Sequence, residues 1–144
     1  MTNPSAFGTQ ILGQTEKALN AILAQRLAGT GLNEARWVTL NVTLAGGAAL
    51  DRDELVGRVV DVLKVSEAQA QTLISELIGA QLLQDEDAQV SLTGAGRELY
   101  GAIRADVAQI TERMWGDLPA EELEVAGRVL GTILARANAE LAAA

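Results

Sequence analysis

Apolar residues recur at helical spacing between Ser66 and Ala80. Five of them share one face of this segment: Ala70, Leu73, Ile74, Leu77 and Ile78. Positions three and four residues apart lie on the same side of a helix, so the pattern predicts an amphipathic helix. Ser66 and Gln69 have the spacing of a capping box, in which each side chain bonds a free backbone N–H group of the first turn.

The period changes to that of a strand after this helix. Leu82 and Leu83 open one strand, and Val90 and Leu92 alternate with polar neighbours in a second one. The acidic run Asp85-Glu86-Asp87 supplies the turn residues between them. The segment therefore predicts a small β-hairpin, which needs a helix beneath it to be stable.

Three more helices are predicted before Ser66. The first spans residues 10–28, and the second begins after Asn33 and ends at Gly46-Gly47. The third opens with a capping-box pair, Asp51 and Glu54, and ends within one or two residues of Val65. Its expected inward positions are Leu55, Val59, Val62 and Leu63.

Two long helices are predicted after the hairpin. Apolar positions step by three and four along the first of them: Leu99, Ile103, Val107, Ile110 and Met114. This helix ends at Gly116, and Pro119 stands at the first position of the last helix, where its missing N–H group costs nothing. Each of these two helices, like the helix at residues 10–28, has an apolar face that must be buried.

These elements predict a mainly α fold with a small β-hairpin. Two helices joined by a tight turn and followed by a hairpin form a winged helix-turn-helix lobe, here at residues 33–97. Helices at 10–28 and 98–142 flank the lobe, and we expect one domain over residues 1–144. We favour a homodimer formed by the flanking helices; the alternative is that they pack only on their own chain.

Composition excludes several kinds of chemistry. The chain has no cysteine and no histidine, which removes thiol nucleophiles, Cys/His metal sites and histidine acid–base catalysis. The two acidic clusters, 51–54 and 85–87, are better explained by helix capping and turn formation than by metal binding. We therefore expect no enzyme, no metal and no cofactor.

Charge and hydropathy bear on the compartment and the partner. The formal charge of −8 repels nucleic acid at long range. No apolar run reaches the roughly eighteen residues of a membrane span. The first ten residues, MTNPSAFGTQ, lack the basic start and apolar centre of a signal peptide. We expect a cytoplasmic protein with no membrane association.

Four motifs, in the expected order, are similar to those of one known family. They are Trp37 with Leu40, Leu77 followed by Leu82-Leu83, the run LTGAGREL at 92–99, and GDLPAEELE at 116–124. Over nearly its full length the chain resembles the MarR family of winged-helix transcriptional regulators. The resemblance implies a homodimer that inserts the helix from Ser66 to Ala80 into the major groove of an operator and lays the wing, residues 84–89, along the minor groove.

The resemblance also implies a small lipophilic or phenolic effector. Such a molecule binds between the lobe and the dimer region, changes the spacing of the two lobes and releases operator DNA. Candidate lining residues are Trp37, Leu40, Arg36, Met114 and Trp115. They offer apolar surface with one polar group, although a large ring such as Trp37 more often anchors a core.

The chain departs from the family pattern in two places. It has no Lys or Arg between Val65 and Gly96, where the family carries cations for DNA. The same segment holds five carboxylates, at Glu67, Glu76, Asp85, Glu86 and Asp87, for a formal charge of −5. Gln81 replaces the family's glycine after the recognition helix, so we expect that turn to be built differently.

Two hypotheses follow from these observations. In the first, the protein is a ligand-responsive regulator, a repressor, whose phosphate contacts come from Arg52, Arg58, Lys64 and Arg97. Base reading falls to Gln71, Thr72 and Ser75 on the recognition helix, and Ser66 and Gln69 at its start complete the candidate DNA-binding set. In the second, the acidic wing has lost DNA binding and the dimer binds a small molecule or a protein. Arg97 pairing with a carboxylate, and a merely solvated polar helix face, are the simpler alternatives for these residues.

Overall fold

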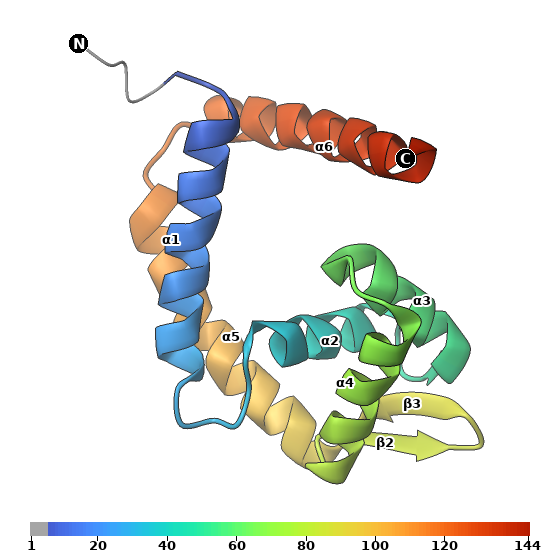
Figure 1. The fold of residues 1–144 in the computed structure, drawn as a ribbon. Coiled ribbons are helices and arrows are strands. Elements are labelled where there is room, and N and C mark those ends of the chain that lie inside the picture. The colour runs from blue at the N-terminus through green and yellow to red at the C-terminus, as the bar shows by residue number, and fades with distance from the viewer. Residues whose placement is uncertain (1–5) are drawn as a thin grey trace. The chain divides into compact units, whose positions relative to one another are not determined.

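The computed structural model describes residues 6–144 (Figure 1). The chain divides into two compact units, one reaching to Val107 and the other running from Ala108 to Ala144. Its elements in order are α1 (Thr9–Leu27), α2 (Glu34–Ala45), β1 (Leu50–Asp51), α3 (Arg52–Leu63), α4 (Glu67–Gly79), β2 (Leu83–Glu86), β3 (Gln89–Leu92), α5 (Gly94–Trp115) and α6 (Ala120–Ala143). The mainly α fold with a winged helix-turn-helix is confirmed.

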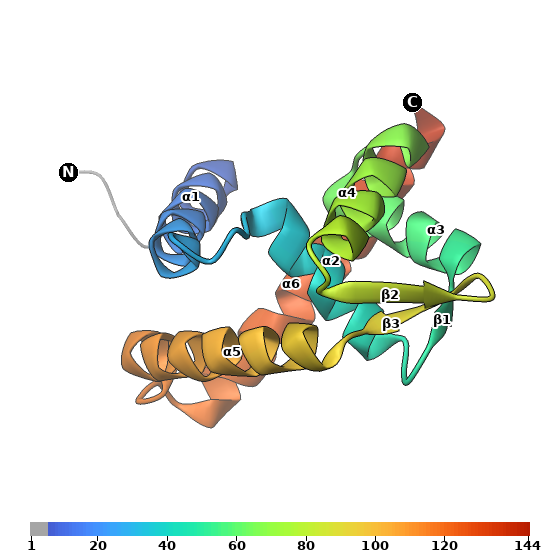
Figure 2. The ribbon, with the colours of Figure 1, turned by 90° about the horizontal axis from the view of Figure 1, so that it is seen from below.

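The first unit contains a three-stranded antiparallel sheet in the order β1-β3-β2 (Figure 2). Val90 in the central strand lies opposite Leu50 of β1 and opposite Asp85 of β2. The hairpin of β2 and β3 is the predicted one, whereas β1 is not predicted, because two residues are too few to have a readable period. The added strand ties the start of α3 to the wing.

The core of the first unit lies between α2, α3, α4 and the sheet. Its fully buried side chains are Leu27, Leu40, Leu55, Val59, Ala70, Ile74, Leu77, Leu83 and Val90. Trp37 stacks on Tyr100 of α5 with ring centroids 4.9 Å apart. The Tyr100 hydroxyl donates a hydrogen bond to Asn41 Oδ1 at 2.6 Å, so the buried end of the ring is satisfied. These contacts fix the lobe on the first half of α5.

One predicted inward position is wrong. Val62 is 54% exposed, although Leu55, Val56 and Val59 of the same helix are buried. The stripe that faces the core continues from Val59 through Val60 and Leu63, which both pack against the core cluster. Val62 lies on the edge of that stripe, about a quarter turn from its centre, and so remains in contact with solvent.

The hairpin turn also differs from the prediction. Asp85 and Glu86 belong to β2, and the two-residue turn is Asp87-Ala88. Both turn residues have positive φ, 53° and 62°. Such a turn twists in the sense that an antiparallel ribbon needs, and it normally carries Asn-Gly or Asp-Gly. Ala88 takes the second position at a cost in backbone energy.

The turn after α4 has the conformation that glycine usually adopts at this position. The expectation that Gln81 changes the turn is wrong. Gln81 has φ of 64° and stands in the left-handed position. The N–H of Leu82 donates to the carbonyl of Leu77 at 3.0 Å, and the N–H of Gln81 donates to that of Ile78 at 2.9 Å. These two bonds define a Schellman motif. The Gln81 carbonyl accepts a further bond from the Thr93 hydroxyl at 2.6 Å, which holds the strained residue in place.

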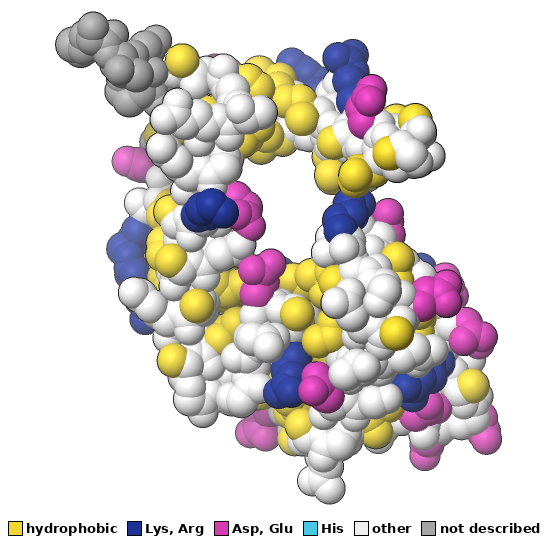
Figure 3. Space-filling model, in the orientation of Figure 1, with side chains coloured by type: hydrophobic (Ala, Val, Ile, Leu, Met, Phe, Trp, Pro, Cys, Tyr) yellow, Lys and Arg dark blue, Asp and Glu magenta, His cyan; other side chains and the backbone are white. Residues whose placement is uncertain are grey.

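The second unit consists of the end of α5 and the helix α6. α5 as a whole begins at Gly94, four residues before the predicted start at 98, because Thr93 Oγ1 accepts the backbone N–H of Gly96 and caps the helix. Large apolar side chains of α6 are exposed: Leu123, Val125, Val129, Leu130, Leu134 and Leu141. Yellow hydrophobic atoms mark the surface of this helix in Figure 3. Within residues 6–144, no helix combines the length and the hydropathy that crossing a membrane requires.

Candidate nucleic-acid interface

The N-terminus of the recognition helix, α4, is fixed by the predicted capping box. Ser66 Oγ accepts the N–H of Gln69 at 3.1 Å, and Gln69 Oε1 accepts the N–H of Ser66 at 2.9 Å. Lys64 ends α3 in the left-handed conformation, with φ of 58°, so the turn between the two helices is tight. Both polar groups therefore position α4, and in this state neither is directed at a base.

The polar side chains on the outward face of α4 are bonded to two arginines and to one backbone carbonyl of the same helix. Gln71 and Ser75 each accept a hydrogen bond from Arg52 at the start of α3. Thr72 donates to the carbonyl of Ala68, one turn earlier in its own helix. Glu76 forms an ion pair with Arg36 of α2 at 3.4 Å. The three predicted base-reading residues Gln71, Thr72 and Ser75 thus lie on one face, as predicted.

Arg52 connects the recognition helix to the wing. Its Nε donates to Gln71 Oε1 at 3.1 Å, its Nη2 to Ser75 Oγ at 3.0 Å, and its Nη1 to Asp85 Oδ2 at 3.1 Å. The side chains of Arg52 and Asp85 are 25% and 28% exposed. The guanidinium of Arg52 therefore joins two other predicted DNA-binding residues, Gln71 and Ser75, to a carboxylate of the wing.

The other predicted phosphate contacts differ in their partners. Arg58 pairs with Glu54 one turn earlier at 3.1 Å, and Lys64 lies 3.7 Å from Asp61 Oδ1. Both pairs are exposed, and exposed pairs exchange partners at little cost. Arg97 is exposed near the first turn of α5, and its guanidinium has no hydrogen bond or ion pair within residues 6–144. Both hypotheses for Arg97, a phosphate contact and a pair with a carboxylate, stay predictions.

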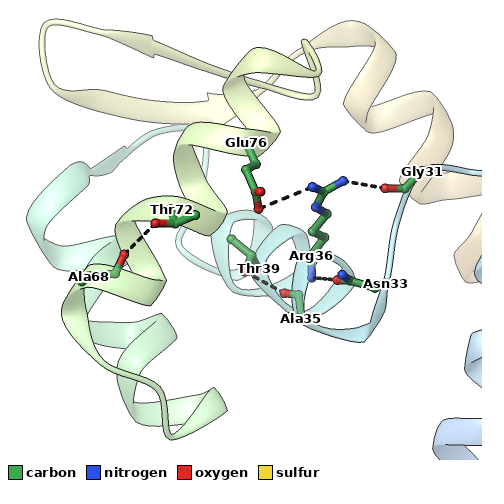
Figure 4. A network of polar contacts seen from close by, with 8 residues as sticks. All are labelled: Gly31, Asn33, Ala35, Arg36, Thr39, Ala68, Thr72 and Glu76. Carbon is green, nitrogen blue, oxygen red and sulfur yellow. Dashed lines mark hydrogen bonds and ion pairs between the residues drawn. The ribbon is translucent and has the colours of Figure 1, made fainter.

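A shallow groove beside α4 was not predicted from the sequence; Figure 4 shows four of its lining residues, Ala35, Ala68, Thr72 and Glu76. Its volume is about 400 Å³, and it is lined by Ala35, Val65, Ala68, Gln69, Thr72, Leu73 and Glu76. At one end, Arg36 donates to the carbonyl of Gly31 at 2.8 Å and pairs with Glu76. The groove arises from small side chains on two helices that are far apart in sequence, so no local pattern could have indicated it.

Comparison with known proteins places the fold. No protein-family model matches the chain, and a search of curated proteins finds no match. Among solved structures, a MarR protein from Peptoclostridium difficile has a TM-score of 0.75 at 17% identity, covering 97% of this chain and 94% of its own. A transcriptional regulator has a TM-score of 0.73 at 26% identity, covering 90% of this chain and 96% of its own.

A third solved structure is that of BpsR from Bordetella bronchiseptica, whose DNA binding is regulated by 6-hydroxynicotinic acid. Its TM-score is 0.67 at 23% identity, and the alignment covers 92% of this chain and 97% of the other. This chain has the MarR-family winged-helix fold. The expectation drawn from LTGAGREL and the other motifs is confirmed at the level of the fold.

The MarR-type lobe of this chain is acidic. Residues 33–97 carry ten acidic and five basic side chains, a formal charge of −5. Magenta carboxylates gather over α3 and the hairpin in Figure 3. Four of the five cations are paired with carboxylates, and only Arg97 is not. The lobe as a whole is thus acidic.

The residues of the predicted effector pocket fall into two groups. Trp37 is 8% exposed and Leu40 is fully buried, and both belong to the core of the first unit. Arg36 is engaged with Gly31 and Glu76. Met114 and Trp115 belong to the second unit, where Trp115 is 40% exposed. A pocket formed by all five residues stays a prediction.

Proposed function

We propose that the protein is a cytoplasmic, ligand-responsive transcriptional regulator, a repressor, that binds double-stranded DNA through α4 and the wing. The observation that carries the proposal is the exposed amide and hydroxyl face of α4, which a helix-turn-helix with a wing presents on a rigid lobe. Amides and hydroxyls bond base edges in the major groove. The likeness to transcriptional regulators along about nine-tenths of the chain supports the same function.

In this proposal the lobe divides the work between two sets of residues. Gln71, Thr72 and Ser75 read bases, and Ser66 and Gln69 hold the end of the helix that enters the groove. Arg52, Arg58, Lys64 and Arg97 contact phosphates, each after leaving or sharing its present partner. Because there are few cations, most of the affinity comes from base contacts and shape.

The active form is a homodimer joined through α1 and α6. Six large apolar side chains of α6 are exposed in the single chain, which is more than a surface helix usually leaves in water. Burying them against a second copy removes that surface from solvent and sets the spacing of the two lobes.

The effector is a small aromatic or otherwise lipophilic molecule. BpsR, which shares this fold, responds to 6-hydroxynicotinic acid, an aromatic acid. Trp37, Leu40, Arg36, Met114 and Trp115 are the proposed lining, with Arg36 as the polar group. Binding there shifts the two lobes relative to one another and lowers the affinity for DNA.

A second candidate function rests on the charge of the lobe. A winged helix whose cations are nearly all paired, and whose wing carries Asp85, Glu86 and Asp87, meets DNA phosphates with repulsion. Such a dimer would bind a small molecule or a protein instead of DNA.

A salt series of DNA binding separates the two functions. We would measure binding to the DNA that flanks the protein's own gene and to a duplex of random sequence, from low to physiological ionic strength. Binding to the flanking DNA alone, with a shallow dependence on salt, supports the regulator. Failure to bind either duplex at the lowest salt refutes it and leaves the second candidate.

A further inference from the structure

Arg52 is the one cation that touches both DNA-facing elements of the lobe. Its guanidinium has five N–H groups, and three of them are used by Gln71, Ser75 and Asp85. The first two partners lie on the recognition helix, and the third lies in β2 of the wing. Arg52 itself begins α3, and its backbone N–H donates to the carbonyl of Ala88 in the turn at 2.9 Å. The backbone of Arg52 is therefore anchored to the wing as well.

The Asp85 carboxylate binds Arg52 through a type of contact that a phosphate can also make. Carboxylate and phosphate oxygens bind arginine with the same hydrogen-bond geometry and the same sign of charge. The pair lies at the boundary with solvent, since both side chains are about one-quarter exposed. A partly exposed pair of this kind is weak enough for a stronger anion to replace one member.

Gln71 and Ser75 keep the Arg52 side chain in place independently of Asp85. They hold the guanidinium through Nε and Nη2, so the loss of Asp85 would free Nη1 without releasing the side chain from α4. The freed group would remain between the recognition helix and the wing, the two elements that the proposed function sets against DNA. No other cation of the lobe is placed in this way.

We propose that Asp85 is an internal competitor of the DNA backbone for Arg52, so that DNA binds only by displacing a carboxylate of the wing from the guanidinium. This inference rests on the proposed DNA-binding function. It adds a built-in restraint: the wing lowers the affinity of its own lobe for any duplex, and the restraint acts through one ion pair and not through the total charge of the wing.

Two charge-removing substitutions in the same strand test the proposal. Asp85→Asn removes the competing charge and keeps the size of the side chain. Glu86→Gln removes one negative charge at the next residue, which has no ion pair or side-chain hydrogen bond within residues 6–144. Both are made in the full chain and again in an Arg52→Gln background. Binding to a fluorescent random-sequence duplex is measured by anisotropy over a range of salt, with thermal melts to verify folding.

We expect Asp85→Asn to bind about threefold to tenfold more tightly at low salt than Glu86→Gln, because one more phosphate is contacted. Its plot of log affinity against log salt should be steeper by about 0.9. In the Arg52→Gln background the two substitutions should become equal. Binding that appears only in Asp85→Asn also supports the proposal.

Different results would overturn the two proposals, the competitor role of Asp85 and the DNA-binding function. Equal affinities for Asp85→Asn and Glu86→Gln, in chains that bind DNA, overturn the competitor and leave the regulator intact. Weaker binding of Asp85→Asn than of the unaltered chain also overturns it, since the ion pair would then position the wing. If no chain binds either the random duplex or the flanking DNA at the lowest salt, the DNA-binding function itself falls, and the competitor falls with it.

Discussion

Replacing Gly96 by alanine tests the junction between the wing and α5. A Cβ atom at residue 96 would lie 2.1 Å from the carbonyl oxygen of Leu82, 3.0 Å from its carbonyl carbon and 3.3 Å from its Cα. All three are backbone atoms, so no side chain can rotate away. The Leu82 carbonyl accepts the N–H of Thr93 at 3.1 Å, and the Leu82 N–H completes the turn after α4. The backbone there must shift, and at least one of these bonds is lost.

The size of the effect follows from three terms. Overpacking a well-packed site costs roughly 1–3 kcal/mol. Losing one backbone hydrogen bond costs about 1 kcal/mol more. Alanine in place of glycine in a helix returns about 1 kcal/mol. The net expected loss in the free energy of unfolding is about 2 kcal/mol, which lowers the melting temperature by roughly 8 °C in a chain of this size.

The matched control lies in the same helix. Gly101 has no atom within 4 Å of an added Cβ, so Gly101→Ala should be neutral or stabilising by about 0.5–1 kcal/mol. Urea unfolding followed by circular dichroism measures both variants. If Gly96→Ala is as stable as Gly101→Ala, then Leu82 does not approach residue 96 as described, and the steric requirement for glycine at this position is refuted.

Three further predictions concern strained turns and the apolar helix. Gln81→Gly should raise the free energy of unfolding by about 0.5–1 kcal/mol, because glycine adopts positive φ without penalty; an unchanged urea midpoint would contradict this. Ala88→Gly should stabilise the hairpin by about 1 kcal/mol for the same reason, measured as slower amide exchange in β2 and β3. Leu134→Asp should convert the dimer to a monomer in sedimentation, because Leu134 is 59% exposed in the single chain. Ala135→Glu, on the side of α6 that carries none of the six exposed apolar side chains, should leave it dimeric; dissociation of both variants, or of neither, would argue against this face.

Sequence patterns correctly predicted the elements that are stabilised by interactions between residues close in the sequence. The capping box of Ser66 and Gln69 depends on two residues three apart, and both of its hydrogen bonds are formed. Alternation placed Val90 and Leu92 in a strand with both side chains buried. Apolar spacing identified the core face of α4. In each case the interaction that stabilises the element joins residues that are close in the sequence, so a pattern in the sequence is enough to identify it.

The turn at Gln81 shows where such reasoning stops. The chemistry of Gln81 disfavours positive φ, and the sequence alone therefore predicted a different turn. The Thr93 hydroxyl, twelve residues away, bonds the Gln81 carbonyl and stabilises the strained conformation. Likewise, the bonds from Arg52 to Gln71 and Asp85 cross 19 and 33 residues. The position of Arg52 at the start of α3 identified it as a candidate, but nothing in the sequence indicated its partners.

The acidity of the lobe has a consequence for specificity as well as for affinity. Non-specific binding to DNA is almost entirely electrostatic, whereas specific binding adds base contacts that do not depend on salt. A lobe with a charge of −5, in which Arg52 is already occupied by Asp85, therefore loses a larger share of its non-specific binding free energy than of its specific binding free energy. On the proposed function, the acidic wing keeps the dimer off bulk DNA. Neutralising Asp85 adds the same phosphate contact to both complexes, so it should tighten binding to random duplex and to the flanking DNA by similar factors, and a gain confined to the flanking DNA would refute this account of the wing.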